Sequence, residues 1–181
     1  ASLFSRTLVY FIRPAGVQSM AFASLCPALT VECGKVGQSA GEVHAQDFLD
    51  ACLHLSQIPD HPVAAHDVDL FHTVATVRVP RAYSFGFGEQ PVDICFIDDL
   101  DHLNFRELPA GTTLAQLDSV HELPLEVCDE RGREVADRFF QVEGDMLRTT
   151  RAVMPSMFTL DERVIRQDCL GYLMERYPLP D

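Results

Sequence analysis

The stretch PALTVECGKVGQSAGEVHAQDFLDACLHLSQ, residues 27–57, contains the clearest fold signal in the sequence. Ala28–Glu32 is a short apolar run with β-branched residues, and it predicts a buried strand. A loop of small and polar residues follows it. From Glu42 to Gln57 the apolar residues share one helix face: Ala45, Phe48, Leu49, Cys52 and Leu53. A strand followed by an amphipathic helix predicts an α/β layer.

The residues before this stretch predict a similar pair. Thr7–Ile12 (TLVYFI) is typical of a buried strand, and Val17–Leu25 suits a short helix. Residues 1–66 are therefore expected to run strand, helix, strand, helix. Because two strands alone make a poor sheet, we interpret residues 1–66 as the end of a larger mixed sheet with helices.

Residues 67–181 are expected to form a β-rich C-terminal domain. The alternation of Phe71–Val79 predicts a strand. Strands are also expected over residues 92–97, 125–128, 135–142 and 146–153. A turn is expected at residues 129–133, with Gly132 at positive φ, and Glu143–Asp145 should connect the last two strands. The C-terminus, Asp161–Arg176, is predicted to be helical, with Ile165, Cys169, Tyr172 and Leu173 on its apolar face.

The amino-acid composition argues against some classes of binding partner. The chain has 181 residues, 47% of them hydrophobic, and a formal net charge of −13. This charge argues against nucleic acid and against anionic membrane surfaces, since both attract basic proteins. No apolar run approaches the roughly 18 residues of a membrane span. The six cysteines form no CxxC pair, which favours a reducing cytoplasm and no disulfide framework.

Glu32 is the first candidate functional residue. It ends a predicted strand and leads directly into Cys33 and Gly34. In open α/β sheets, ligands bind outside the carboxyl ends of the strands, so a carboxylate there can reach a substrate. The alternative is a structural glutamate that pairs with Lys35 or is solvated.

The segment PALTVECGK (27–35) resembles the catalytic-glutamate segment of the succinylglutamate desuccinylase/aspartoacylase family. The resemblance continues through the helix EVHAQDFLDACLHL (42–55) and the strand DLFHTVATVRVP (69–80), which is similar to the entry to the family's C-terminal β-rich domain. It extends weakly through FRELPAGTTLA (105–115). The resemblance therefore covers most of this chain but only the last part of the family's length.

The resemblance implies a carboxypeptidase-like fold and a zinc-dependent amidohydrolase. In that family zinc lowers the pKa of a water molecule. The carboxylate matching Glu32 acts as general base on the water and then protonates the leaving amine. The implied substrate is an N-acyl amino acid or a similar small amide.

The chain also departs from the family pattern. It has no His-x-x-Glu motif, and no histidine precedes Glu32. The zinc ligands are therefore expected upstream of this chain, with no metal ligands within it, and the isolated chain is expected to be inactive. Phe22 and Gln18 stand where aspartoacylases hold the substrate carboxylate with Arg and Tyr. Arg13 is the candidate in this chain for binding a substrate carboxylate.

Other polar groups give weaker signals. His61, His66 and His72 come nearest to a zinc-ligand spacing, but solvated histidines in loops and on a strand face are the favoured interpretation. Asp98, Asp99 and Asp101 lack the EF-hand pattern. Cys33 needs a neighbouring histidine to act as a nucleophile.

Two further hypotheses stay open. The chain is alternatively a non-catalytic β-rich module for binding or oligomerisation, in which Glu32 is structural. The second of these hypotheses is that the chain is an independent metal-binding protein that uses His61, His66 and His72. An exposed sheet edge in residues 1–66 also predicts self-association, as a dimer or as an aggregate.

Overall fold

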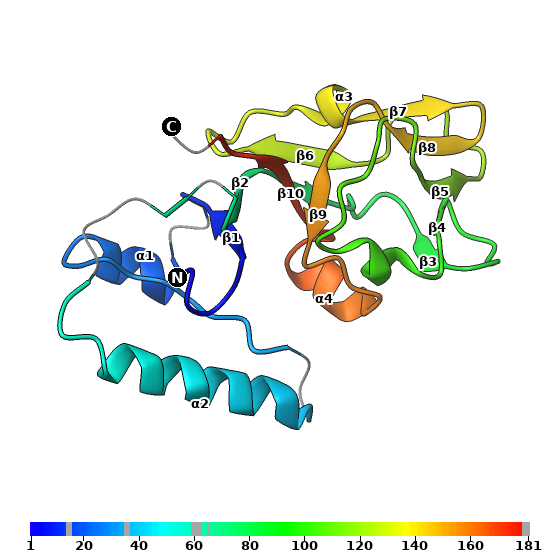
Figure 1. The fold of residues 1–181 in the computed structure, drawn as a ribbon. Helices are drawn as coiled ribbons and strands as arrows, with labels where there is room; N and C mark the ends of the chain where they lie inside the picture. Colours follow the sequence, from blue (N-terminus) through cyan, green and yellow to red (C-terminus); the bar gives the residue numbers. More distant parts are fainter. Residues whose placement is uncertain (14–15, 35–36, 59–62, 65, 179–181) are drawn as a thin grey trace. The chain divides into compact units, whose positions relative to one another are not determined.

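The computed structural model describes residues 1–13, 16–34, 37–58, 63–64 and 66–178. The fold is mixed α/β, with mostly strands, two mixed sheets and few helices (Figure 1). The elements in chain order are β1 (Thr7–Tyr10), α1 (Gln18–Ala23), α2 (Ser39–Leu53), β2 (Asp69–Arg78), β3 (Phe85–Phe87), β4 (Ile94–Phe96), the 3-10 helix η1 (Leu100–Leu103), β5 (Thr113–Leu117), β6 (Glu126–Asp129), α3 (Ala136–Phe139), β7 (Phe140–Glu143), β8 (Met146–Thr149), β9 (Met154–Ser156), α4 (Glu162–Gln167) and β10 (Gly171–Arg176).

The chain divides into two compact units. Unit 1 comprises residues 1–72 and 176–181, and unit 2 comprises residues 73–175. The predicted boundary lies after residue 66, and the division of the structure falls inside β2.

The first sheet has the strand order β1-β2-β10-β9, and β6 also pairs with β2. β1 and β2 are parallel, with Thr7 opposite Asp69 and Tyr10 opposite His72. β2 is antiparallel to β6, and β10 is antiparallel to β9. The predicted strand over Phe71–Val79 is thus confirmed as the greater part of β2.

The second sheet lies within unit 2 and has the order β3-β4-β5-β8-β7. β3 and β4 are parallel, and the remaining pairs are antiparallel. The predicted connection at Glu143–Asp145 is confirmed, since β7 and β8 form a hairpin there and Gly144 has φ +66°. Gly132 has φ +74°, as its turn requires.

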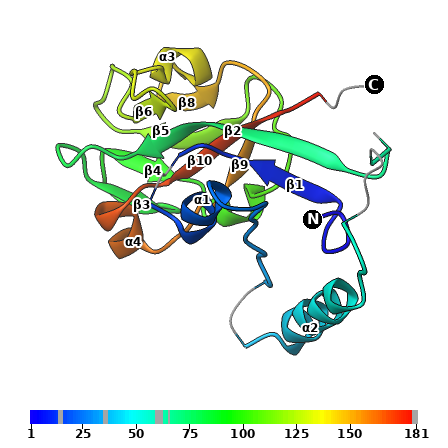
Figure 2. The ribbon, with the colours of Figure 1, turned by 90° about the vertical axis from the view of Figure 1, so that its left-hand side faces the viewer.

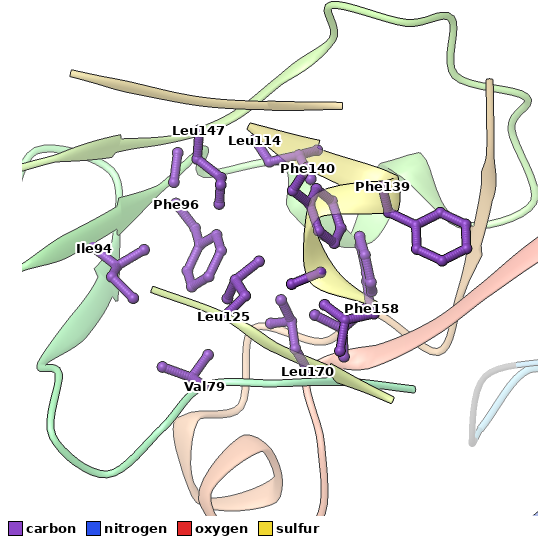
Figure 3. Close-up of a cluster of buried hydrophobic side chains, with 14 of the residues drawn as sticks. Val79, Ile94, Phe96, Leu114, Leu125, Phe139, Phe140, Leu147, Phe158 and Leu170 are labelled. Atoms are coloured by element: carbon purple, nitrogen blue, oxygen red, sulfur yellow. The ribbon is translucent and has the colours of Figure 1, made fainter. Parts of the chain in front are cut away.

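The main hydrophobic core belongs to unit 2 and draws side chains from strands of both sheets. Figure 3 shows Phe96 and Leu147 of the second sheet directed toward Leu125, Phe158 and Leu170. Phe96, Phe140 and Leu147 are at most 1% exposed. Burial of this apolar area is the main stabilising contribution to unit 2.

Unit 1 buries few of its large apolar side chains. Phe48 of α2 packs edge-on against Phe4, with ring centroids 5.2 Å apart. Leu49 and Leu53, on the predicted apolar face of α2, are 61% and 83% exposed. The helix itself is confirmed. On its predicted apolar face Phe48 is buried, Ala45 and Cys52 are half-buried, and Leu49 and Leu53 are not covered by the described residues.

Two secondary-structure predictions for residues 135–176 were wrong in part. Residues 161–176 do not form one helix, because α4 ends at Gln167 and Gly171–Arg176 form β10. Of the four residues predicted on its apolar face, Ile165, Cys169 and Leu173 are buried and Tyr172 is half-buried. The predicted strand over residues 135–142 is instead the short helix α3 followed by β7.

Candidate functional site

Glu32 lies in a segment without regular secondary structure. Residues 27–34 form no helix or strand, so the predicted strand over Ala28–Glu32 was wrong. A strand needs a neighbour to bond its backbone N–H and C=O groups, and no described strand lies beside this segment. The Glu32 side chain is exposed to solvent.

The segment that carries Glu32 is packed against the first turn of α2. A Cβ atom built on Gly41 would lie 1.7 Å from the carbonyl oxygen of Cys33. Gly34 has φ +90°, a conformation that favours glycine. The Cys33 thiol contacts the carbonyl oxygen of Val31 at 3.8 Å. Glu32 is thus held through its neighbour Cys33 while its own carboxylate remains accessible.

Arg13 follows β1 and is also exposed. No hydrogen bond or ion pair joins Glu32 or Arg13 to another described residue. The predicted roles of Glu32 and Arg13 therefore remain predictions. Nothing in their contacts assigns either residue a structural task.

Of the three histidines considered as metal ligands, His61 lies outside the described residues. His66 is exposed, and its Nε2 lies 3.4 Å from a carboxylate oxygen of Asp67. His72 stacks among aromatic rings instead. Within the residues that the structure describes, no three His, Cys, Asp or Glu side chains form a group suited to a metal ion. The described residues therefore do not fit a zinc centre.

An aromatic cluster in unit 1 was not predicted from the sequence. The ring of His72 lies 5.1 Å from Tyr10 and 5.9 Å from Tyr177, between centroids. The two tyrosine rings are 6.1 Å apart, and both are partly exposed. Because side chains alternate along β2, His72 lies on the other face of the strand from Phe71. Nothing local in the sequence brings Tyr177 beside Tyr10 and His72.

A charged cluster also belongs to unit 1. Arg6 Nε donates to Asp69 Oδ2 at 2.9 Å, and Arg176 donates to Asp69 Oδ1 at 2.7 Å. The hydrogen bond from Arg176, followed by that from Arg6, lowers the pKa of Asp69. The Arg176 guanidinium also lies 4.9 Å from the centre of the Phe71 ring. These contacts tie residues near both chain ends to the start of β2.

Comparison with models of known protein families, with curated proteins and with solved structures finds no match to this chain. None of the helices in the described ranges is both long and apolar enough to cross a bilayer. All six cysteines are free thiols.

Proposed function

We propose that this chain is the C-terminal part of a zinc-dependent hydrolase that cleaves the amide bond of an N-acyl amino acid or a similar small amide. The proposal includes membership of the succinylglutamate desuccinylase/aspartoacylase family and a carboxypeptidase-like fold. Its sequence support is the resemblance of residues 27–35, 42–55 and 69–80, in that order, to the family.

The structural observation that carries the proposal is the placement of Glu32. Its carboxylate is exposed, and the next residue packs against Gly41 at the start of α2. A general base must be accessible to water and substrate while its backbone is held in place. Glu32 meets both conditions.

The exposed apolar surface of unit 1 supports a larger catalytic domain. Its exposed large apolar side chains include Leu25, Leu29, Leu49, Leu53 and Ile58. In unit 2 they are limited, among the described residues, to Phe105, Met157, Leu160 and Val164. Water-exposed apolar side chains in such number are typical of a surface that another segment covers. We infer that further residues of the hydrolase cover unit 1.

In this hydrolase Glu32 accepts a proton at its carboxylate from the attacking water. It then delivers the proton to the amine nitrogen as the carbon–nitrogen bond breaks. Zinc would be held by residues outside this chain, and it would supply an activated water by lowering the pKa of that water. Arg13 binds the carboxylate of the substrate through its guanidinium group.

The first test is the coding sequence upstream of residue 1. A His-x-x-Glu motif and a later histidine are expected there, and absence of the motif contradicts the zinc mechanism. The longer protein should hold about one zinc ion per chain, and the 181-residue chain close to none. Elemental analysis measures both.

The second test replaces Glu32 with Gln in the longer protein. Loss of the general base should lower kcat about 10²- to 10⁴-fold while zinc content stays unchanged. Glu42→Gln, an exposed change in the first turn of α2, is the matched control. Unchanged hydrolysis by Glu32→Gln would remove Glu32 as the base and favour the non-catalytic module.

A further inference from the structure

The β1 strand has one free edge. β1 stands at the end of its sheet and pairs in parallel with β2 along its other edge. No other strand of the described ranges approaches the free edge. An uncovered edge presents backbone N–H and C=O groups to any strand that can pair with them.

The register identifies which residues face that edge. The Arg6 carbonyl accepts a hydrogen bond from the Asp69 backbone N–H at 2.8 Å. In a parallel pair, alternate residues direct their backbone groups to the partner strand. Arg6, Leu8 and Tyr10 therefore face β2, and Val9 directs its N–H and C=O groups away from it. Val9 is also 38% exposed.

The sequence of this edge is unusual for an exposed strand. TLVYFI, residues 7–12, has no charged residue and no proline, and both of its faces are largely apolar. Edge strands that stay single usually carry a charge, a proline or a bulge. Short uncharged segments of high β propensity pair readily with identical segments.

From this edge we propose that two copies of the chain associate through antiparallel pairing of β1 with β1, with Val9 on the two-fold axis. The Val9 N–H of each copy donates to the Val9 carbonyl of the other. Leu8 of one copy then lies opposite Tyr10 of its partner, and Thr7 opposite Phe11. Such a pairing is self-complementary and closes as a dimer.

The flanking charges agree with this register. With Val9 on the axis, Arg6 lies opposite Ile12 and Arg13 lies opposite Ser5 of the other copy. If one copy slid by one residue along the other, Arg6 would lie opposite Arg13 of its partner. Arg6 pairs at 2.9 Å with Asp69, a carboxylate that it shares with Arg176.

The net charge of the chain gives the dimer a distinctive salt dependence. Two chains that each carry −13 repel one another at long range. The pairing itself uses neutral backbone groups and apolar side chains. Added salt screens the repulsion, so the dimer should become tighter as the salt concentration rises. An interface held by ion pairs would weaken instead. The inference concerns β1 of the 181-residue chain. In the longer hydrolase proposed above, the residues that cover unit 1 would compete with the second copy for this edge.

The test is sedimentation velocity of the 181-residue protein and three variants. Val9→Pro removes the outward N–H without removing a hydrogen bond to β2, and edge strands tolerate such a proline. Val9→Lys places a charge on the edge. Val43→Lys, at a position in α2 that is 56% exposed, makes the same charge change elsewhere. Circular dichroism checks that each variant is folded.

The wild type and Val43→Lys should form dimers, and both Val9 variants should dissociate at least about tenfold more readily. A monomeric wild type would overturn the proposal, as would a dimer that both Val9 variants retain. Assembly into open polymers would also overturn it, because two-fold pairing of β1 closes after two copies.

Discussion

Gly41 approaches Cys33 so closely that a Cβ atom on Gly41 would lie 1.7 Å from the Cys33 carbonyl oxygen. No side chain larger than hydrogen fits there without movement of one backbone relative to the other. The contact links the first turn of α2 to the residue that follows Glu32. It therefore connects a helix to the candidate general base.

Replacement of Gly41 with Ala should displace the Cys33 segment or distort the start of α2. Overpacking of this kind costs about 1–3 kcal/mol of stability. In the proposed longer hydrolase, the same change should lower kcat by moving Glu32. Gly16→Ala is the control, because no heavy atom lies within 4 Å of its added Cβ. Equal stability and equal kcat of the two variants would show that Cys33 moves without consequence.

Asn104 should be a major stabilising residue of unit 2. Its Nδ2 donates to the Phe158 carbonyl at 2.8 Å, and its Oδ1 accepts from the Phe158 N–H at 2.8 Å. Asn104→Asp removes the donor and sets two acceptors against each other, which should cost about 1–3 kcal/mol in urea unfolding. Gln116→Glu also removes an amide donor, which bonds Asp145 at 3.0 Å, but this pair is exposed to water and the change should have a much smaller effect.

Arg166 should resist replacement by lysine. Its guanidinium donates to the carbonyls of Pro80 and Tyr83, at 3.2 and 2.7 Å, and lies 4.4 Å from the centre of the Phe85 ring. Lysine cannot reproduce this planar fork, so Arg166→Lys should cost about 1–3 kcal/mol. Arg163→Lys, on the same helix with an 87% exposed side chain, is the control. Similar thermal melting of the two variants would contradict this role for Arg166.

The Asp129 turn should weaken in acid. The side-chain hydrogen bond from Arg133, followed by backbone N–H donors of Arg133 and Arg131, lowers the pKa of Asp129 from 3.8 to about 2. Because the folded pKa lies below the unfolded pKa, the carboxylate stabilises the fold above pH 3.8. This contribution is lost as the pH falls from 3.8 to about 2.

Urea unfolding at a series of pH values measures this effect. The stability difference between wild type and Asp129→Asn should shrink as the pH falls through that window. Asp137→Asn, at an exposed position of α3, serves as the control and should show little change. A difference between wild type and Asp129→Asn that stays constant with pH would contradict the Asp129 assignment.

The local pattern was enough to predict several elements. The helical repeat around Phe48 predicted α2, and the alternation from Phe71 to Val79 predicted β2. Gly132 and Gly144 predicted turns, and both have positive φ. These signals succeed because helix periodicity, strand alternation and glycine conformation depend on residues close together in the chain.

The failures have a different physical cause. Ala28–Glu32 has the composition of a strand, but no described strand bonds to it. The spacing of Ile165, Cys169 and Leu173 fits a helix face, yet Gly171–Arg176 pairs with β9. In both cases the outcome depends on whether a distant segment supplies backbone partners, which the local pattern does not encode.

By itself, the sequence determined the amphipathic helix α2, the long strand β2, the glycine turns and the acidic charge, because each follows from local spacing or composition. Tertiary structure alone decided that Tyr10, His72 and Tyr177 stack together and that Arg6 and Arg176 share Asp69. It also decided that no described strand pairs with the outer edge of β1, and that Glu32 is exposed while Cys33 lies against α2. These features join residues far apart in the chain, and they exist only once strand pairing has set the register.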